Sequence, residues 1–341
     1  MGGEMPVLDS LLRELERMRG ELKASLSQLS EIQIEGLEWI DVEPTRPPSV
    51  VASDSSRHQA LERYALIYAA QGIAVKYEGG LKEQKEGAVV DYVLMGGYRG
   101  QRAIWDGLVS NRFKTLEVQL ASQLESQYVL FDGSYSAFLA AKLPPLLEDS
   151  EHLAKYYRQA KESWQERVKT LRNMRREGRK LVFVSKSVTR AYLTEGDRVK
   201  IGGGGLRPPD FAIVESLSGR GRVGFAWSER LVYTRKLPKW EEAEGGLQEE
   251  DLVFTLTYAR LKEGGPLFQL TVPGEVKERE LREMVSHLSY LSPAGYPQPL
   301  ADAHHLSLLK HKEFMELVRG FGILAETGRE VLEQIARTRK L

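Results

Sequence analysis

Two short stretches of the chain, V50-V-A-S-D54-S-S-R57 and Y128-V-L-F-D132-G-S-Y135, decide how it is expected to fold. Each is an apolar run of strand length that is followed at once by an aspartate. Two such strands lying side by side would bring the carboxylates of Asp54 and Asp132 close enough to share divalent cations. The pair therefore predicts a metal site where two neighbouring strands end.

The composition limits what kind of site this can be. The chain has 341 residues, of which 42% are hydrophobic and 28% charged, so it can bury a sizeable core as one elaborated domain or two ordinary ones. It contains no cysteine, which excludes disulfides, thiolate zinc sites and cysteine nucleophiles. Any metal must be held by carboxylates, histidines or carbonyls, and such ligands suit manganese or magnesium.

Neither a membrane span nor a signal segment is visible in the sequence. Apolar stretches such as 66–75 fall short of the roughly 18 to 20 residues that cross a bilayer. The first residues, M-G-G-E-M-P, lack both a basic segment and an apolar signal core. A cytoplasmic location is expected.

The formal net charge of zero conceals a basic stretch. Residues 155–190 contain twelve Lys or Arg against three Glu, an excess of nine positive charges. Such a stretch attracts polyanions such as DNA. A solvated helix face that is balanced by acidic residues elsewhere is an equally good interpretation of the stretch taken alone.

Apolar spacing divides the chain into an arm and a core. Residues 7–33 repeat Leu, Met and Val at three- and four-residue steps, which predicts an amphipathic helix. The run E43-P-T-R-P-P48 cannot be helical and marks a linker. We therefore expect a helical arm and linker over residues 1–47, and one domain with helices at its carboxy-terminal end over residues 48–341.

Strands and helices are mixed along the core. The fold class expected is α/β, with a mixed sheet flanked by helices. The predicted strands are 50–53, one within 60–77, 89–95, 128–131, 181–185, 223–236, 252–260 and 267–272. The predicted helices are 101–126, 149–178, a short one from Asp210, 275–291, 299–320 and 322–339, with a flexible loop over 200–209.

Four residues in this frame form an ordered set of metal-ligand types. Asp54 ends a strand, Glu117 lies on the next helix, Asp132 ends the following strand, and His304 opens a late helix after Tyr296. Phosphodiester hydrolysis with two metals needs several such ligands converging from different elements. Strand Asp, helix Glu, strand Asp and late helix His or Asp is the layout of ribonuclease H-like nucleases.

Each member of the set also has an ordinary interpretation. D54-S-S and D132-G-S are common capping or turn tripeptides. A single helical glutamate such as Glu117 is usually solvated, and His304, beside His305, fits a surface helix with incidental histidines. The order of the set, with apolar runs before both aspartates, favours the metal site.

At these residues the chain resembles the NurA nucleases. The resemblance is carried by V50-V-A-S-D-S-S-R57, Glu117, F131-D-G-S134, V184-S-K-S187 and G295-Y-P-Q-P-L-A-D-A-H304, and it extends over about residues 48–315. It implies that Asp54, Glu117, Asp132 and His304 are metal ligands and that Tyr296 lies beside them. Ser55 stands where the family usually has glycine, which would strain the turn if that position required positive φ.

The resemblance also implies a fold and a function. NurA proteins have a ribonuclease H-like core, form homodimers around a DNA channel, and cut DNA with manganese in DNA end processing together with the hexameric HerA ATPase. The expectation is a Mn²⁺-dependent (Mg²⁺ possible) 5′–3′ exonuclease and single-strand endonuclease that acts in double-strand break repair. The residues expected to contact DNA are Arg57, Arg172, Arg175, Arg176 and Lys186.

Two rival functions stay open at this stage. Another ribonuclease H-like nuclease, such as a junction resolvase, would use the same carboxylates. A DNA-binding scaffold subunit with a decayed site is the alternative that is not an enzyme, although such a protein would more often have lost one of the four ligands. The chain has no G-x-x-x-x-G-K-[ST] motif, so translocation energy would have to come from a partner.

Overall fold

The computed structural model describes residue 12 and residues 14–19, 33–61, 65–94, 101–143, 151–186, 191–193, 200–202, 209–218 and 221–320. Residues 12 and 14–19 are helical, as the predicted arm requires, but the rest of 7–32 lies outside the described residues. The predicted helix over 322–339 and the glycine run after Gly202 lie outside them as well.

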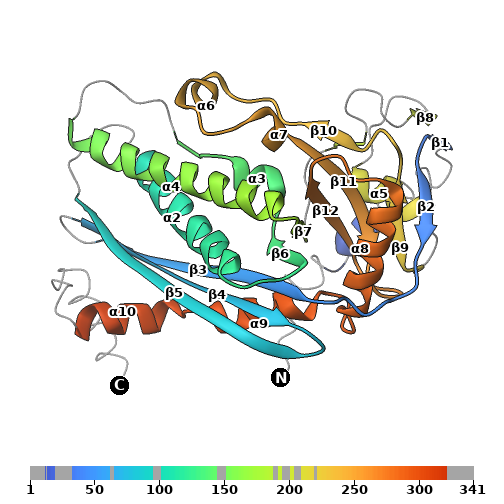
Figure 1. Ribbon diagram of the computed structural model, residues 1–341, viewed down its shortest axis with the longest axis horizontal. Coiled ribbons are helices and arrows are strands. Elements are labelled where there is room, and N and C mark those ends of the chain that lie inside the picture. Colours follow the sequence, from blue (N-terminus) through green and yellow to red (C-terminus); the bar gives the residue numbers. More distant parts are fainter. Residues whose placement is uncertain are drawn as a thin grey trace, which may run out of the picture.

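A ten-stranded mixed sheet forms the centre of the molecule (Figure 1). Its strand order is β2-β9-β11-β12-β7-β6-β3-β4-β5, and β10 pairs with β11 beside this path. The strands are β2 (Glu38–Asp41), β3 (Val50–Leu61), β4 (Ala65–Tyr77), β5 (Leu81–Leu94), β6 (Tyr128–Asp132), β7 (Lys180–Ser185), β9 (Gly224–Trp227), β10 (Val232–Thr234), β11 (Val253–Arg260) and β12 (Leu267–Pro273). A separate pair joins β1 (Gln33–Glu35) to β8 (Lys200–Gly202).

The five strands β3 to β7 form a characteristic unit within this sheet. β3, β4 and β5 are an antiparallel meander, and β6 and β7 follow parallel to β3 on its other side. Between β5 and β6 lies helix α2 (Gln101–Ser122), and between β6 and β7 lie α3 (Tyr135–Leu139) and α4 (Glu151–Arg176). The expected fold class, an α/β fold with a mixed sheet flanked by helices, is confirmed.

Helices cover both faces of the sheet, because the central strands are apolar on both sides. Val51, Val129 and Phe131 pack with α2 and α4, whereas Val50, Tyr128 and Leu130 pack on the opposite face. That second face carries α8 (Glu278–Tyr290) and α9 (Gln298–Ser307), followed by α10 (His311–Gly320). The remaining helices are α5 (Asp210–Leu217), α6 (Lys239–Glu244) and α7 (Glu249–Leu252).

Several predicted boundaries were wrong for identifiable reasons. β3 continues to Leu61 and β5 begins at Leu81, because their polar halves pair with β4 without showing an apolar run. The predicted strand over 223–236 is two strands, and the predicted helix over 299–320 is interrupted at Leu308, which has extended dihedrals. β2, which lies before the expected domain start at residue 48, pairs with β9 in the main sheet.

None of the helices in the described ranges is long and apolar enough to cross a membrane.

Candidate active site

Asp54 and Asp132 occupy matching positions on neighbouring parallel strands. β3 and β6 pair from Val50 opposite Tyr128 to Ser53 opposite Phe131, and the two aspartates are the next residues on each strand. Neighbouring strands lie about 4.8 Å apart, so this register brings the two carboxylates to one place. The expected juxtaposition of the two strands is confirmed.

The backbone around Asp54 differs from the predicted turn. Asp54 does not end its strand, because β3 goes on pairing with β4 after its pairing with β6 has stopped. Ser55 lies opposite Gly72 in that ladder, and it is not among the described residues that have positive φ. The serine that replaces the usual glycine therefore imposes no backbone strain.

Asp132 does lie at the end of its strand, as predicted. Gly133 follows with a φ of 117°, a conformation that favours glycine, and its N–H donates to the Val184 carbonyl at 2.9 Å. Ser134 then caps α3 by accepting from the N–H of Ala137. Lys186, just beyond β7, donates to Asp132 Oδ2 at 2.7 Å. This turn fixes the direction of the Asp132 side chain.

Glu117 is buried between α2 and β3, which excludes the solvated interpretation of this residue. Its side chain is 3% exposed, Oε2 accepts from Ser55 Oγ at 3.2 Å, and Oε1 has no hydrogen-bond partner. Ser53 holds the helix in place by donating to the Glu117 carbonyl at 2.8 Å. Burial raises the pKa of the Glu117 carboxyl well above its ordinary value, and the charges of Asp54 and Asp132 raise it further.

His304 lies in the last turn of α9, not at the start of a helix as predicted. Its Nδ1 lies 2.7 Å from Asp54 Oδ2, although the two residues are 250 positions apart. The Ser56 side chain of β3 holds the end of this helix in place. Its hydroxyl donates to the Ser307 carbonyl and also accepts from the N–H of Leu309. His305, the neighbouring histidine, is exposed.

Tyr296 lies over the same group of residues. Its hydroxyl is buried without a hydrogen-bond partner, and the Lys186 ammonium lies 4.5 Å from the centre of its ring. Burial raises the pKa of Tyr296, and the charges of Asp132 and Asp54 act in the same direction. The structure thus brings Asp54, Glu117, Asp132, Tyr296, Lys186 and His304 together.

The chemistry of these side chains suits a hard divalent cation. Glu117 presents a buried oxygen with no partner, next to two further carboxylates. Among the described residues, no three His, Asp or Glu side chains are already grouped around one point as a metal cage. Asp54 instead faces His304, and Asp132 faces Lys186. Each of these two contacts involves one carboxylate oxygen, Oδ2 of the aspartate.

The three arginines of the basic stretch that were expected to contact DNA, Arg172, Arg175 and Arg176, lie elsewhere. They are near the end of α4, and this helix leads into the start of β7, whereas Asp132 lies at the end of the neighbouring β6. Arg172 and Arg175 contact Asp251, and Arg176 pairs with Glu250 at 2.8 Å. The structure does not bring these arginines to the carboxylates. Arg57 follows Asp54 by three residues on β3, and its guanidinium lies 4.8 Å from the Phe113 ring centre.

Sequence patterns missed three residues that support the site. Ser55 holds Glu117, Ser307 lies 3.5 Å from Asp54, and Lys114 is one helical turn before Glu117. The spacing of Lys114 and Glu117 on one helix was available in the sequence. The contact between Ser307 and Asp54 was not, because it depends on how α9 docks against β3.

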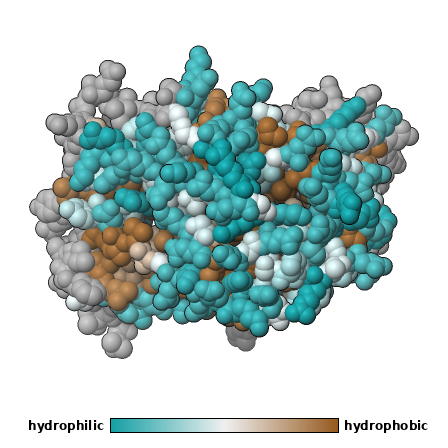
Figure 2. All heavy atoms as spheres, viewed as in Figure 1, coloured by the Kyte–Doolittle hydropathy of each residue, from teal (hydrophilic) through white to brown (hydrophobic). Residues whose placement is uncertain are grey.

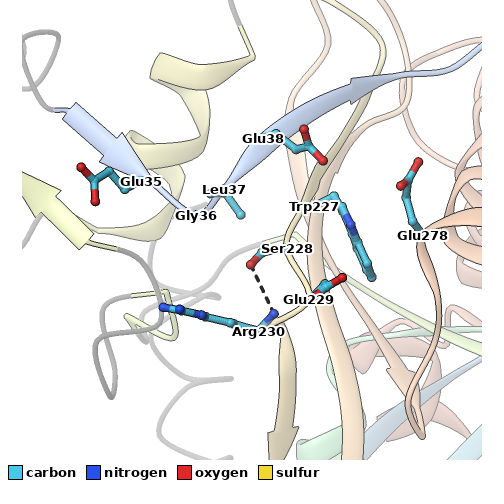
Figure 3. A pocket seen from close by; sticks show the side chains of 9 residues that line it. All are labelled: Glu35, Gly36, Leu37, Glu38, Trp227, Ser228, Glu229, Arg230 and Glu278. Carbon is cyan, nitrogen blue, oxygen red and sulfur yellow. Dashed lines mark hydrogen bonds between the residues drawn. The ribbon is translucent and has the colours of Figure 1, made fainter.

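A separate hollow of about 690 Å³ lies beside β2, at the far edge of the sheet (Figure 3). Its side chains include Trp227 and Arg230, and the Arg230 N–H donates to Ser228 Oγ. Four glutamates also line it, namely Glu35, Glu38, Glu229 and Glu278. Such a lining repels a phosphate backbone. This hollow is therefore distinct from the carboxylate site.

Comparison with known proteins identifies similar chains. The NurA domain family model matches residues 48–307. The NurA nuclease from Sulfolobus solfataricus is 19% identical, with a TM-score of 0.66 over 94% of this chain and 97% of that one. A NurA bound to dAMP and manganese is 14% identical, with a TM-score of 0.56 over 96% of this chain and 98% of that one.

One curated relative also matches. An uncharacterized protein of Methanocaldococcus jannaschii is 33% identical over 87 residues, which is 22% of this chain. The match spans about a fifth, 21%, of that relative's length.

Proposed function

The chain belongs to the NurA family, and from this membership and its carboxylate site we propose that it is a metal-dependent DNA nuclease that hydrolyses phosphodiester bonds. One observation carries the proposal. Asp54 and Asp132 follow the last paired residues of two neighbouring parallel strands, and the buried Glu117 lies close enough for both charges to raise its pKa. Burying the Glu117 carboxylate beside two partly exposed aspartates is costly unless a cation joins them.

In this proposal each residue has a defined role. Asp54, Glu117, Asp132 and His304 would hold Mn²⁺, with Mg²⁺ as the possible substitute, and a metal held there would supply positive charge for the attacking and leaving oxygens. Lys186 exchanges its contact with Asp132 for a phosphate oxygen of the DNA. The buried Tyr296 hydroxyl, which has no partner, donates a hydrogen bond to the same phosphate group.

Finer parts of the proposal follow the family resemblance. We place the protein in the cytoplasm as a homodimer that works with a HerA-type hexameric ATPase in DNA end resection and double-strand break repair. It would act as a 5′–3′ exonuclease and as a single-strand endonuclease.

Cleavage of a labelled oligonucleotide tests the proposal. Asp132→Asn is expected to lower the Mn²⁺-dependent rate by about a thousandfold or more, because a lost ligand removes several kcal/mol of transition-state stabilisation. The same variant should bind Mn²⁺ more weakly in calorimetry. Glu125→Gln, which changes an exposed glutamate just beyond α2, is the matched control and should keep full activity. A fully active Asp132→Asn protein would refute the assignment.

A further inference from the structure

Four cationic side chains gather on the α2 side of the carboxylate site. Burial lowers the pKa of Lys114 to about 7, and the neighbouring charges of Arg167, Lys142 and Arg57 contribute to this shift. Glu117 is the one acidic residue whose charge acts in the opposite direction on Lys114. Among the described residues, none of the four cations forms an ion pair with a carboxylate. The exposed side chains of Arg57 and Lys142 therefore carry positive charge that no ion pair with a described carboxylate neutralises.

A rigid backbone segment supports this group. Arg167 is fully buried, yet its guanidinium donates only to backbone carbonyls, those of Phe138, Ala140 and Asn111. Every carbonyl from Ala137 to Ala141 accepts from a side chain: in chain order the donors are Lys114, Arg167, Trp164, Arg167 and Asn111. These bonds hold the segment from Ala137 to Ala141 against α2 and α4, and the bonds from Arg167 to carbonyls leave the charge of that guanidinium in place.

Lys142 directly follows the segment from Ala137 to Ala141, and its backbone is strained. Its φ is 51°, which makes it the non-glycine residue with positive φ in the described part of the chain. The backbone approaches α2 so closely at this point that a Cβ on Gly107 would lie 2.7 Å from the Lys142 carbonyl oxygen. Lys142 itself is exposed. The fold thus holds this lysine at one place on the surface.

Arg57 completes the exposed side of the group. It lies on β3, and its guanidinium stacks on Phe113 at 4.8 Å. Burial lowers the pKa of Lys142, and the charge of Arg57 lowers it further. A small hollow of about 250 Å³ opens beside Arg57, and Asp106, which also lines it, forms no ion pair with that arginine.

We propose that Arg57 and Lys142 bind a phosphate group of the DNA strand next to the one being cleaved, and that the buried guanidinium of Arg167 strengthens this binding. The inference rests on the proposed nuclease function, since it extends the same site along the strand. Arg57 is three residues from Asp54, and Lys114 is three residues from Glu117. A strand bound at the carboxylates would place its neighbouring phosphate within reach of this group. Arg57 offers a planar set of donors and Lys142 a point charge.

Binding without metal tests this subsite separately from catalysis. The affinity for a fluorescent single-stranded oligonucleotide is measured by anisotropy in EDTA over a series of salt concentrations. Arg57→Gln and Lys142→Gln should each lower the affinity about fivefold or more and flatten the log-log salt slope by roughly 0.7. Arg279→Gln, an exposed arginine on α8 across the sheet, should change neither. Unchanged affinity and slope in both variants would overturn the proposal.

Lys142→Gly separates a binding role from a structural one. Glycine adopts positive φ without strain, so this variant should unfold at the same or a higher temperature. It should nevertheless bind DNA as weakly as Lys142→Gln. If Lys142→Gly bound DNA like the wild type, the lysine charge would have no role and the proposal would fail. Arg57→Lys, which keeps the charge, should recover most of the lost affinity.

Oligonucleotides with a 5′-phosphate, a 3′-phosphate or neither distinguish the two sources of the phosphate. A 5′-phosphate preference that disappears in Arg57→Gln identifies a terminal phosphate site. Equal affinity for all three oligonucleotides, with the same loss of affinity for each in Arg57→Gln, identifies an internal phosphodiester. The measurement needs no cleavage. An active Asp132→Asn enzyme would therefore refute the proposed catalytic site and leave the binding result standing. Unchanged DNA binding in Arg57→Gln and Lys142→Gln would refute the phosphate subsite and leave the catalytic site standing.

Discussion

At the scale of the residue, Glu117 shows how the site lowers the stability of the metal-free protein. Its carboxyl is buried, one of its oxygens has no partner, and two aspartates lie near it. Folding therefore favours the protonated form of Glu117, while the proposed metal needs the ionised form. The metal-free protein should therefore have a lower free energy of unfolding than a variant with a neutral side chain at position 117. Metal binding should raise the free energy of unfolding again.

Glu117→Gln is expected to stabilise the metal-free protein near neutral pH. The folded-state pKa of Glu117 lies above its unfolded value, so its contribution to stability is fully present below the ordinary pKa of 4.5 and is lost as the pH rises towards the raised folded-state value. Glutamine stays neutral at every pH and avoids that loss. Melting temperatures from pH 4 to pH 8 should show a difference of a few degrees that grows with pH.

The matched control is again Glu125→Gln, which should melt like the wild type at every pH. Added Mn²⁺ should raise the melting temperature of the wild type and leave Glu117→Gln almost unchanged. A glutamine variant that is less stable than the wild type at pH 8 would contradict the effect of burial.

His304 and His305 form a natural pair for a second test. Both histidines are exposed, but His304 contacts Asp54, and the adjacent His305 lies about a hundred degrees further around the helix. His304→Ala should lower the rate at saturating DNA about a hundredfold or more and change DNA affinity little. His305→Ala should have little effect on either quantity. If His305 were the essential one, the docking of α9 on β3 would have to be different.

At the scale of the element, helix α4 shows how a basic sequence can serve packing. The Arg172 side chain is 11% exposed and forms its ion pair with Asp251, which is 2% exposed. Asp251 also accepts from the N–H of Gln248 and so caps α7. Of the two interpretations of the basic stretch, the one in which acidic residues balance it describes this end of the helix. Its contact with DNA stays a prediction.

Two substitutions on α4 should therefore differ strongly. Arg172→Ala leaves the buried Asp251 without its main partner and should lower the free energy of unfolding by about 3–5 kcal/mol in urea titrations. Arg176→Ala breaks an exposed pair and should cost less than about 1 kcal/mol. Arg176→Glu tests the DNA contact: a salt slope of DNA binding equal to that of the wild type would assign the helix end to packing alone.

The elements that the sequence predicted well are those whose own residues form a recognisable apolar pattern. The runs before Asp54 and Asp132 are buried on both faces, so they stand out as apolar, and their parallel pairing follows from the intervening helix. The polar start of β5 and the short strand β2 belong to the sheet only because β4 and β9 supply hydrogen bonds. Likewise, nothing local to Ser307 indicates that it would meet Asp54.

At the scale of the whole molecule, the long strand β5 is the exposed edge of the sheet. Val90, Tyr92 and Leu94 alternate along it, and between 46% and 66% of each is exposed. Leu317 of α10 is exposed as well. Apolar side chains gather at the lower left of Figure 2, where Figure 1 places α10 and the end of β5. An edge strand of this kind promotes self-association unless another chain covers it.

The proposed homodimer would cover this edge, and we expect a second copy of the chain to do so. Val90→Lys combined with Tyr92→Lys should weaken dimerisation more than tenfold, because charges would replace apolar contacts at the edge. Light scattering after size exclusion, over a range of protein concentrations, measures this change. Glu83→Lys, at an exposed position on the polar half of the same strand, adds a lysine without removing apolar surface and is the control. If the double variant stays as dimeric as the wild type, the two copies meet through another surface, and the apolar edge must be explained by a different partner.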